Sequence, residues 1–219
     1  MKKITVLIIT VLVMAILTAC GSSAGDLSKS EKDTEASNTT GLSAGTEEIA
    51  PETKAAETTD EEPKNIKIAV VYFSGTGNTK KVAEMIAAET GADIYEIVSA
   101  QAYTDEDLNY NDDNCRANKE QNDDSSRPEI NNDLAETIEY DVIYLGHPIW
   151  WGTVPRIMQT YLETYDLSGA TIYTFCTSGG SSIDRSLSDL KDWYPGLNIV
   201  DGKRLNDATV EDIKEYCNR

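Results

Sequence analysis

The 219-residue chain has few of the residues that usually carry hydrolytic, metal or disulfide chemistry. His147 is its only histidine, and no Gly-x-Ser-x-Gly elbow lies between a predicted strand and helix, so a catalytic triad is not indicated. No cysteine–histidine spacing is typical of a metal site. Apart from Cys20, three cysteines remain, and this odd number implies no disulfide framework. We therefore expect no metal and assign no catalytic residue.

Basic residues are also scarce. The chain carries 19 Lys and Arg against 38 Asp and Glu, which gives a formal net charge of −19. Residues 65–219 alone hold 13 basic and 27 acidic side chains. This balance argues against binding to nucleic acid or adhesion to anionic lipid, because both ligands are negatively charged. It favours basic protein partners.

Only one long apolar run is present, the 16 residues from Ile4 to Ala19. A membrane span needs about 20 apolar residues, and the basic residues before the run are typical of a secretory signal. Leu17-Thr18-Ala19-Cys20-Gly21 resembles the bacterial lipobox. That resemblance implies a signal peptide over residues 1–19 and lipidation of Cys20, which would hold the protein on the extracytoplasmic side of the cell membrane. A plain signal peptide and an uncleaved anchor are the alternatives.

Residues 21–64 contain no aromatic side chain and three large aliphatic ones, Leu27, Leu42 and Ile49. Such a segment cannot bury enough apolar surface to offset the entropy lost on ordering. We expect residues 20–64 to form a lipidated, disordered acidic tether, and residues 65–219 to form the folded domain.

Strand and helix patterns alternate in residues 65–219, which predicts an α/β fold with a parallel sheet covered on both faces. Strands are predicted at 66–73, 93–98, 141–146, 170–176 and 197–200, and helices at 79–90, 132–139, 155–164, 182–191 and from Asp207, its N-cap, onward. Residues 100–130 are polar and do not fit the alternation. A loop of that length is often functional, although a surface excursion that replaces a helix is an equal alternative.

The first turn, Ser74-Gly75-Thr76-Gly77-Asn78-Thr79, lies between the first predicted strand and helix. Backbone N–H groups at the start of a helix suit a phosphate. A nucleoside triphosphate loop needs Lys followed by Ser or Thr after its last glycine, and the dinucleotide fingerprint needs a third glycine where Lys80 stands. The remaining reading is a monophosphate bound by amides and hydroxyls, and the turn resembles the FMN-phosphate loop of flavodoxins.

Two later loops strengthen this resemblance. Pro148-Ile149-Trp150-Trp151-Gly152, the Trp turn, is similar to the flavodoxin loop in which a tryptophan covers one face of the flavin. By this match Trp151 stacks on the ring, and Trp150 lies at the ring edge or in the core; two packing tryptophans are the alternative. Thr177-Ser178-Gly179-Gly180, the Gly-Gly loop, is similar to the loop whose amides contact the pyrimidine end of the ring.

The Gly-Gly loop departs from well-known flavodoxins because it has no tyrosine to cover the second flavin face. Either Tyr103 or Tyr110 supplies that cover, or the face is open. We expect His147 to end its strand rather than to touch the flavin. We also expect Cys176 to be a small buried residue rather than a redox thiol.

Taken together, the resemblance implies a flavodoxin-like three-layer sandwich with strand order 2-1-3-4-5 and FMN as the cofactor of residues 65–219. It implies a monomeric electron-transfer protein that docks with basic redox partners. A NAD(P)H-dependent FMN, quinone or nitro reductase is the alternative, because such enzymes need an uncovered flavin face. A flavin-free binding module on the same fold is the second alternative.

Overall fold

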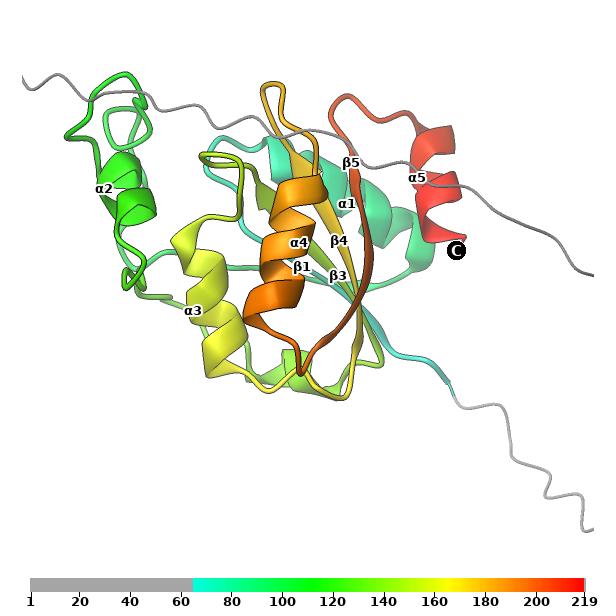
Figure 1. Cartoon of the computed structure of the whole chain (residues 1–219). Helices are drawn as coiled ribbons and strands as arrows, with labels where there is room; N and C mark the ends of the chain where they lie inside the picture. The colour runs from blue at the N-terminus through cyan, green and yellow to red at the C-terminus, as the bar shows by residue number, and fades with distance from the viewer. Residues whose placement is uncertain (1–64, 219) are drawn as a thin grey trace, which may run out of the picture. The chain divides into compact units, whose positions relative to one another are not determined.

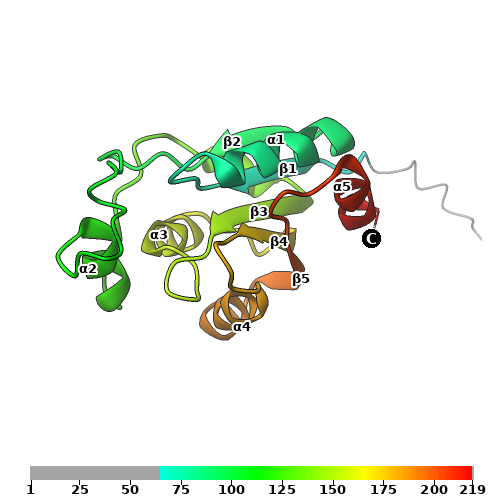
Figure 2. The same ribbon diagram turned by 90° about the horizontal axis from the view of Figure 1, so that it is seen from above.

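The computed structural model describes residues 65–218. The predicted signal peptide, the lipidation of Cys20 and the tether lie outside this range. Within it, five strands form one parallel sheet in the order β2-β1-β3-β4-β5, as predicted. Figures 1 and 2 show α1 and α5 on one side of the sheet and α3 and α4 on the other, which completes the expected three layers.

Most elements lie close to their predicted positions. The strands are β1 (Ile68–Tyr72), β2 (Asp93–Glu96), β3 (Val142–Pro148), β4 (Thr171–Thr177) and β5 (Asn198–Arg204). The helices are α1 (Asn78–Thr90), α2 (Arg116–Asn122), α3 (Arg156–Thr164), α4 (Asp184–Trp193) and α5 (Val210–Cys217), with a 3₁₀ helix at Ala135–Glu139.

The two faces of the sheet have separate apolar cores because successive side chains of a strand point to opposite sides. On β1, Val70 and Tyr72 pack with α1 and α5, whereas Val71 packs with α3 and α4. Parallel strands buried on both faces read as continuous apolar runs, which explains why the sequence pattern located them.

The sheet also fixes where a ligand can bind. Strand β1 pairs with β2 on one side and β3 on the other, so the strand order reverses there. In open parallel sheets ligands bind beyond the carboxyl ends of the strands at such a point. The first turn follows β1, the Trp turn begins at the last residue of β3, and the Gly-Gly loop begins at the last residue of β4.

Two local predictions were wrong. Asp207 is not the cap of the last helix: its φ is +49°, and Thr209 is the N-cap, with a reciprocal capping box to Asp212. Strand β5 continues to Arg204 rather than ending at Val200, since its polar second half still pairs with β4 at the sheet edge. Residues 100–130, for which the sequence left a functional loop and a surface excursion as alternatives, contain the short helix α2.

Residues 100–130 form an excursion closed at its base by an antiparallel bridge between Ser99 and Ile130. Its helix α2 lies outside the three layers, beyond α3, in both views (Figures 1 and 2). The ion pair between Arg116 and Glu120 lies along α2, and Arg116 also donates to the carbonyl of Gln101. No helix in residues 65–218 has the length and apolar character needed to span a membrane.

Candidate functional site

The first turn presents open backbone donors at the start of α1. Gly77 is the N-cap of α1 with φ +83°, and as a glycine it has no side chain to bond the first amides of the helix. The side chains of Thr76 and Asn78 are exposed, and Asn78 Nδ2 donates to Thr76 Oγ1 at 3.1 Å. The Ser74 hydroxyl accepts from the backbone N–H of Lys80 at 3.3 Å. Uncapped amides at a helix N-terminus with neutral polar side chains around them fit a phosphate.

Thr79 differs from the other hydroxyl residues of the first turn. Its side chain is buried, and its Oγ1 lies 2.8 Å from Thr177 Oγ1 at the end of β4. The two hydroxyls satisfy each other away from solvent, so the pair joins the first turn to the Gly-Gly loop. Sequence reasoning treated both residues as cofactor contacts; the structure assigns them this internal bond.

The Trp turn reverses the chain after β3. Trp150 and Thr153 exchange two backbone hydrogen bonds of 3.0 Å, and between them Trp151 has φ +50° and Gly152 φ +84°. A positive φ is costly for a bulky residue and tends to be found at functional sites, where the surroundings hold it in place. The Trp151 side chain is 41% exposed.

Trp150 points the other way, into the core. Its ring meets Phe73 and Tyr103 edge to face, with centroids 5.6 and 5.3 Å apart. A Cβ placed on Gly75 would lie 3.4 Å from Trp150 Cζ2, so the first turn and the Trp turn are in close contact. Trp150 is therefore half-buried against the core, and Trp151 is the more exposed indole.

The Gly-Gly loop is anchored from β5. Ser178 N–H donates to Asn206 Oδ1 at 2.7 Å, and Arg204 donates to Ser178 Oγ and to the Ser178 carbonyl at 3.0 and 3.1 Å. Gly179 and Gly180 are exposed, and a Cβ on either would meet nothing within 4 Å. Their backbone amides are thus accessible beside a fixed Ser178.

A hollow of about 240 Å³ opens beside these loops, and four residues line it: Tyr110, Ile149, Trp150 and Trp151. We call it the aromatic hollow. Tyr110 is 71% exposed. Tyr103 instead packs under Trp150, donates to Glu120 Oε2 at 2.5 Å and has the Arg116 guanidinium 4.0 Å from its ring centre. Tyr110 therefore lies at the aromatic hollow, whereas Tyr103 lines a hollow of about 200 Å³ beside Ser74 and Gly75 of the first turn.

A larger hollow of about 560 Å³ lies at the opposite end of the sheet, around Gly91, Asp93 and Tyr140. It contains none of the predicted site residues. Size alone would select this hollow, but the sheet topology places ligands at the other end.

His147 and Cys176 are register partners on β3 and β4, and both are buried. His147 Nε2 lies 3.2 Å from Ser186 Oγ on α4, and burial lowers the pKa of the imidazole to about 3, so the ring is neutral. Burial raises the pKa of the Cys176 thiol to about 12. Neither group faces the hollow; His147 lies within β3, which continues to Pro148, rather than ending the strand.

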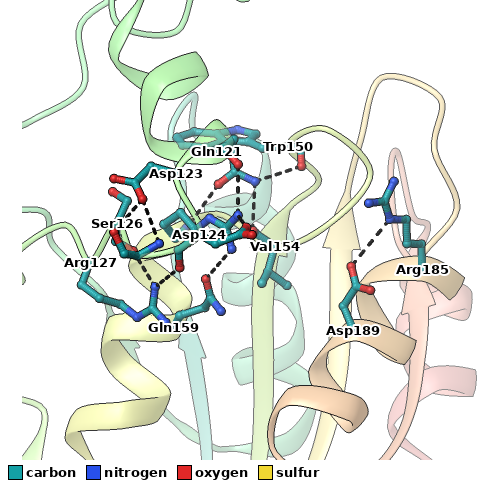
Figure 3. Close-up of polar contacts among 12 residues, drawn as sticks. Gln121, Asp123, Asp124, Ser126, Arg127, Trp150, Val154, Gln159, Arg185 and Asp189 are labelled. Atoms are coloured by element: carbon teal, nitrogen blue, oxygen red, sulfur yellow. Dashed lines mark hydrogen bonds and ion pairs between the residues drawn. The ribbon is translucent and has the colours of Figure 1, made fainter.

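Sequence reasoning missed several residues that organise the site. Gln121 of α2 contacts the segment around Trp150, as Figure 3 shows, and Arg185 of α4 lies against Gly152. No motif or spacing marks these residues. Their roles depend on where the excursion folds back, which the sequence pattern does not specify.

Comparisons with known proteins agree with this geometry. A family model described as flavodoxin matches residues 67–219. A protein from Bacteroides eggerthii, described as a flavoprotein, is 44% identical, with a TM-score of 0.68 over 70% of this chain and 97% of that chain. A second from Bacteroides uniformis, described in the same way, is 40% identical, with a TM-score of 0.66 over 71% and 100% of the two chains.

A third similar structure was solved with a ligand. It is a flavoprotein from Lactobacillus acidophilus in complex with FMN, 27% identical, with a TM-score of 0.55 over 69% of this chain and 98% of that chain. No protein with a curated description matches the chain. Because the solved chains contain little beyond the matched region, we expect residues 65–219 to fold on their own.

Proposed function

The chain belongs to the flavodoxin family, and from that premise we propose that residues 65–219 bind FMN and carry electrons between proteins. One observation carries the proposal: the first turn and the Trp turn meet at the Gly75–Trp150 contact, at the edge of the sheet where strand order reverses. A phosphate site and an exposed aromatic ring therefore lie side by side, as a phosphorylated flavin requires.

The residues present fit FMN. Uncapped amides of residues 75–78 and the side chains of Thr76 and Asn78 would hold the phosphate without a cation, since no basic side chain forms part of the turn. Trp151 would contact the ring, and the accessible amides of Gly179 and Gly180 would meet its polar edge. Thr79 and Thr177 would contribute indirectly, because their mutual hydrogen bond holds the first turn against the Gly-Gly loop.

When bound, FMN would supply the redox chemistry. The chain's own contribution is binding, orientation and electrostatics. Its strong negative charge disfavours further negative charge on the flavin, which should lower the reduction potential.

A basic partner protein is the proposed electron donor or acceptor. Tyr110 is flanked on the excursion by four exposed carboxylates, those of Asp105, Glu106, Asp112 and Asp113. Complementary charge raises association rates and makes them dependent on salt. We further propose that lipidated Cys20 and the tether place this surface outside the cell membrane.

The test of electron transfer uses FMN-loaded residues 65–219 reduced with dithionite and mixed with ferricytochrome c, a basic acceptor. We expect rapid reoxidation whose second-order rate constant falls as ionic strength rises. Asp113→Asn should slow the reaction, whereas Asp192→Asn, an exposed carboxylate on α4, serves as the matched control. A rate independent of salt would contradict docking to a basic partner.

A NAD(P)H-dependent reductase is the second candidate function, and two features of the site favour it. The Gly-Gly loop carries no aromatic side chain, and two arginines, Arg185 and Arg204, lie beside Gly152 and Ser178 respectively. An open ring face with nearby guanidinium groups would suit a nicotinamide nucleotide and its phosphates. Steady-state turnover of NADPH with a quinone, abolished by Arg185→Ala, would favour the reductase over the carrier.

A further inference from the structure

Helix α2 has two buried polar side chains on one face. Asn118 and Gln121 are three residues apart, so they are neighbours on the helix surface. Only 4% of Asn118 and 7% of Gln121 is exposed. Each amide group is directed at a different segment of the site.

Gln121 bonds to both ends of the turn that carries Trp151. Its Nε2 donates to the carbonyls of Trp150 and Val154 at 3.3 and 3.2 Å, and its Oε1 accepts from the backbone N–H of Arg156 at 3.1 Å. Figure 3 shows the amide of Gln121 between these carbonyls. The left-handed conformation of Trp151 lies between the two anchor points, and such conformations persist only where the surroundings impose them.

The turn has little other polar support from its own side chains. Thr153 Oγ1 is buried and has no hydrogen-bond partner in residues 65–218. The backbone pair between Trp150 and Thr153 closes the turn, and the Ile149 N–H donates to the Thr177 carbonyl at 2.8 Å at its start. Gln121 is the side chain that bonds to the segment on both sides of Trp151.

Asn118 holds the opposite side of the aromatic hollow. Its Nδ2 donates to the carbonyls of Tyr110 and Asp112, at 3.2 and 2.6 Å. The Tyr110 ring itself is largely exposed, and its backbone is held by the bond from Asn118 to its carbonyl and by its own N–H, which donates to the Leu108 carbonyl at 2.9 Å.

We propose that Asn118 and Gln121 are positioning residues that set the separation of Tyr110 and Trp151, and thereby the affinity of the site for the flavin ring. This inference rests on the proposed FMN function. It gives the excursion a specific role: α2 is the part that joins the two exposed aromatic side chains of the aromatic hollow. It also makes Tyr110 the second aromatic contact of the ring.

The first experiment compares Gln121→Met with Gln159→Met in residues 65–219. Gln159 is a matched control because it is equally buried and bonds to Arg156 at 2.9 Å, but it makes no contact with the Trp turn. Gln121→Met removes three hydrogen bonds to the segment. A loss equivalent to one net hydrogen bond at the flavin corresponds to about a tenfold change in the equilibrium constant. We expect Gln121→Met to weaken FMN and riboflavin alike by about tenfold, and Gln159→Met to change either by less than twofold.

Riboflavin separates ring positioning from phosphate binding, because it lacks the phosphate. Equal losses for both ligands support the proposal; a loss confined to FMN, or equal effects of the two glutamine variants, would overturn it. Asn118→Leu supplies a second arm that leaves the Trp turn intact and should weaken both ligands by a similar factor. If Gln121→Met fails to fold, Asn118→Leu alone still tests whether α2 sets the affinity for the flavin ring.

Hydrogen exchange of backbone amides in the flavin-free protein tests, without any ligand, whether Gln121 stabilises the Trp turn. We expect the N–H groups of Trp150, Thr153 and Arg156 to exchange faster in Gln121→Met and at the wild-type rate in Gln159→Met. Unchanged exchange in Gln121→Met would overturn the inference even if FMN binds. If Gln121→Met exchanges faster but the wild-type domain binds no FMN, the result would support the role of Gln121 in positioning the Trp turn. It would contradict the proposed FMN function.

Discussion

The single histidine permits a clean test of the buried site between β3 and α4. In the folded protein the pKa of His147 is about 3, because burial penalises the charged ring, whereas an unfolded chain has a value near 6.5. Between these values the unfolded state binds more protons than the folded state. Stability is therefore retained above pH 6.5 and is lost progressively as the pH falls toward 3.

The magnitude follows from linkage. Each pH unit below 6.5 should cost about 1.4 kcal/mol of the free energy of unfolding, which is about 2.5 kcal/mol between pH 7 and pH 4.5. Four carboxylates also have lowered pKa values in the folded protein: Asp123, Glu163, Asp166 and Asp212. Their contribution to stability is lost only as the pH approaches their unfolded values of about 4, and it is the same in any variant that changes His147 alone.

The assay is urea unfolding of flavin-free residues 65–219 at pH 4.5, 5.5, 6.5 and 7, for the wild type and for His147→Gln. Glutamine keeps a polar group near Ser186 but does not titrate. Because relief of the overall acidic charge affects both proteins equally, the difference between them isolates the histidine. Parallel stability profiles would refute the reasoning, since they would mean that the imidazole is protonated in the folded state or is not buried.

Three further predictions concern the loops and the thiols. Thr79→Val or Thr177→Val should each cost about 1–3 kcal/mol in urea unfolding by leaving a buried hydroxyl without a partner, and the double variant should recover part of that loss; strict additivity would contradict the paired bond. Gly77→Ala, at φ +83°, should lower the free energy of unfolding by about 1 kcal/mol and weaken FMN more than riboflavin in titrations. In native residues 65–219, maleimide followed by mass spectrometry should label the partly exposed Cys217 well before Cys176, whose pKa is raised to about 12; equal labelling rates would contradict that burial.

The sequence was sufficient to predict the sheet and the place of the loops. Buried parallel strands are recognisable as apolar runs, and the hydroxyl and glycine order of residues 74–79 excludes the other phosphate loops. The family resemblance supplied the strand order. The match to the flavodoxin tryptophan loop also selected Trp151, which is the more exposed of the two indoles.

What the sequence could not predict depends on contacts between distant segments. The burial of Thr79 follows from its meeting Thr177, 98 residues away, and no local pattern reports such a pair. Helix α2 is only seven residues long and polar, so it has no apolar periodicity to mark it. The positions of Tyr103 beside the first turn and of Tyr110 beside the Trp turn likewise depend on the path of the excursion.

The central claim is that residues 65–219 form an FMN site from three loops, and titration of the flavin-free domain with FMN tests it most directly. We predict saturation at one FMN per chain, with quenching of flavin fluorescence by the indole at residue 151 and less quenching in Trp151→Ala. We also predict weaker binding of riboflavin, which cannot use the first turn. A folded domain that stays colourless and leaves the fluorescence of added FMN unchanged would contradict the account.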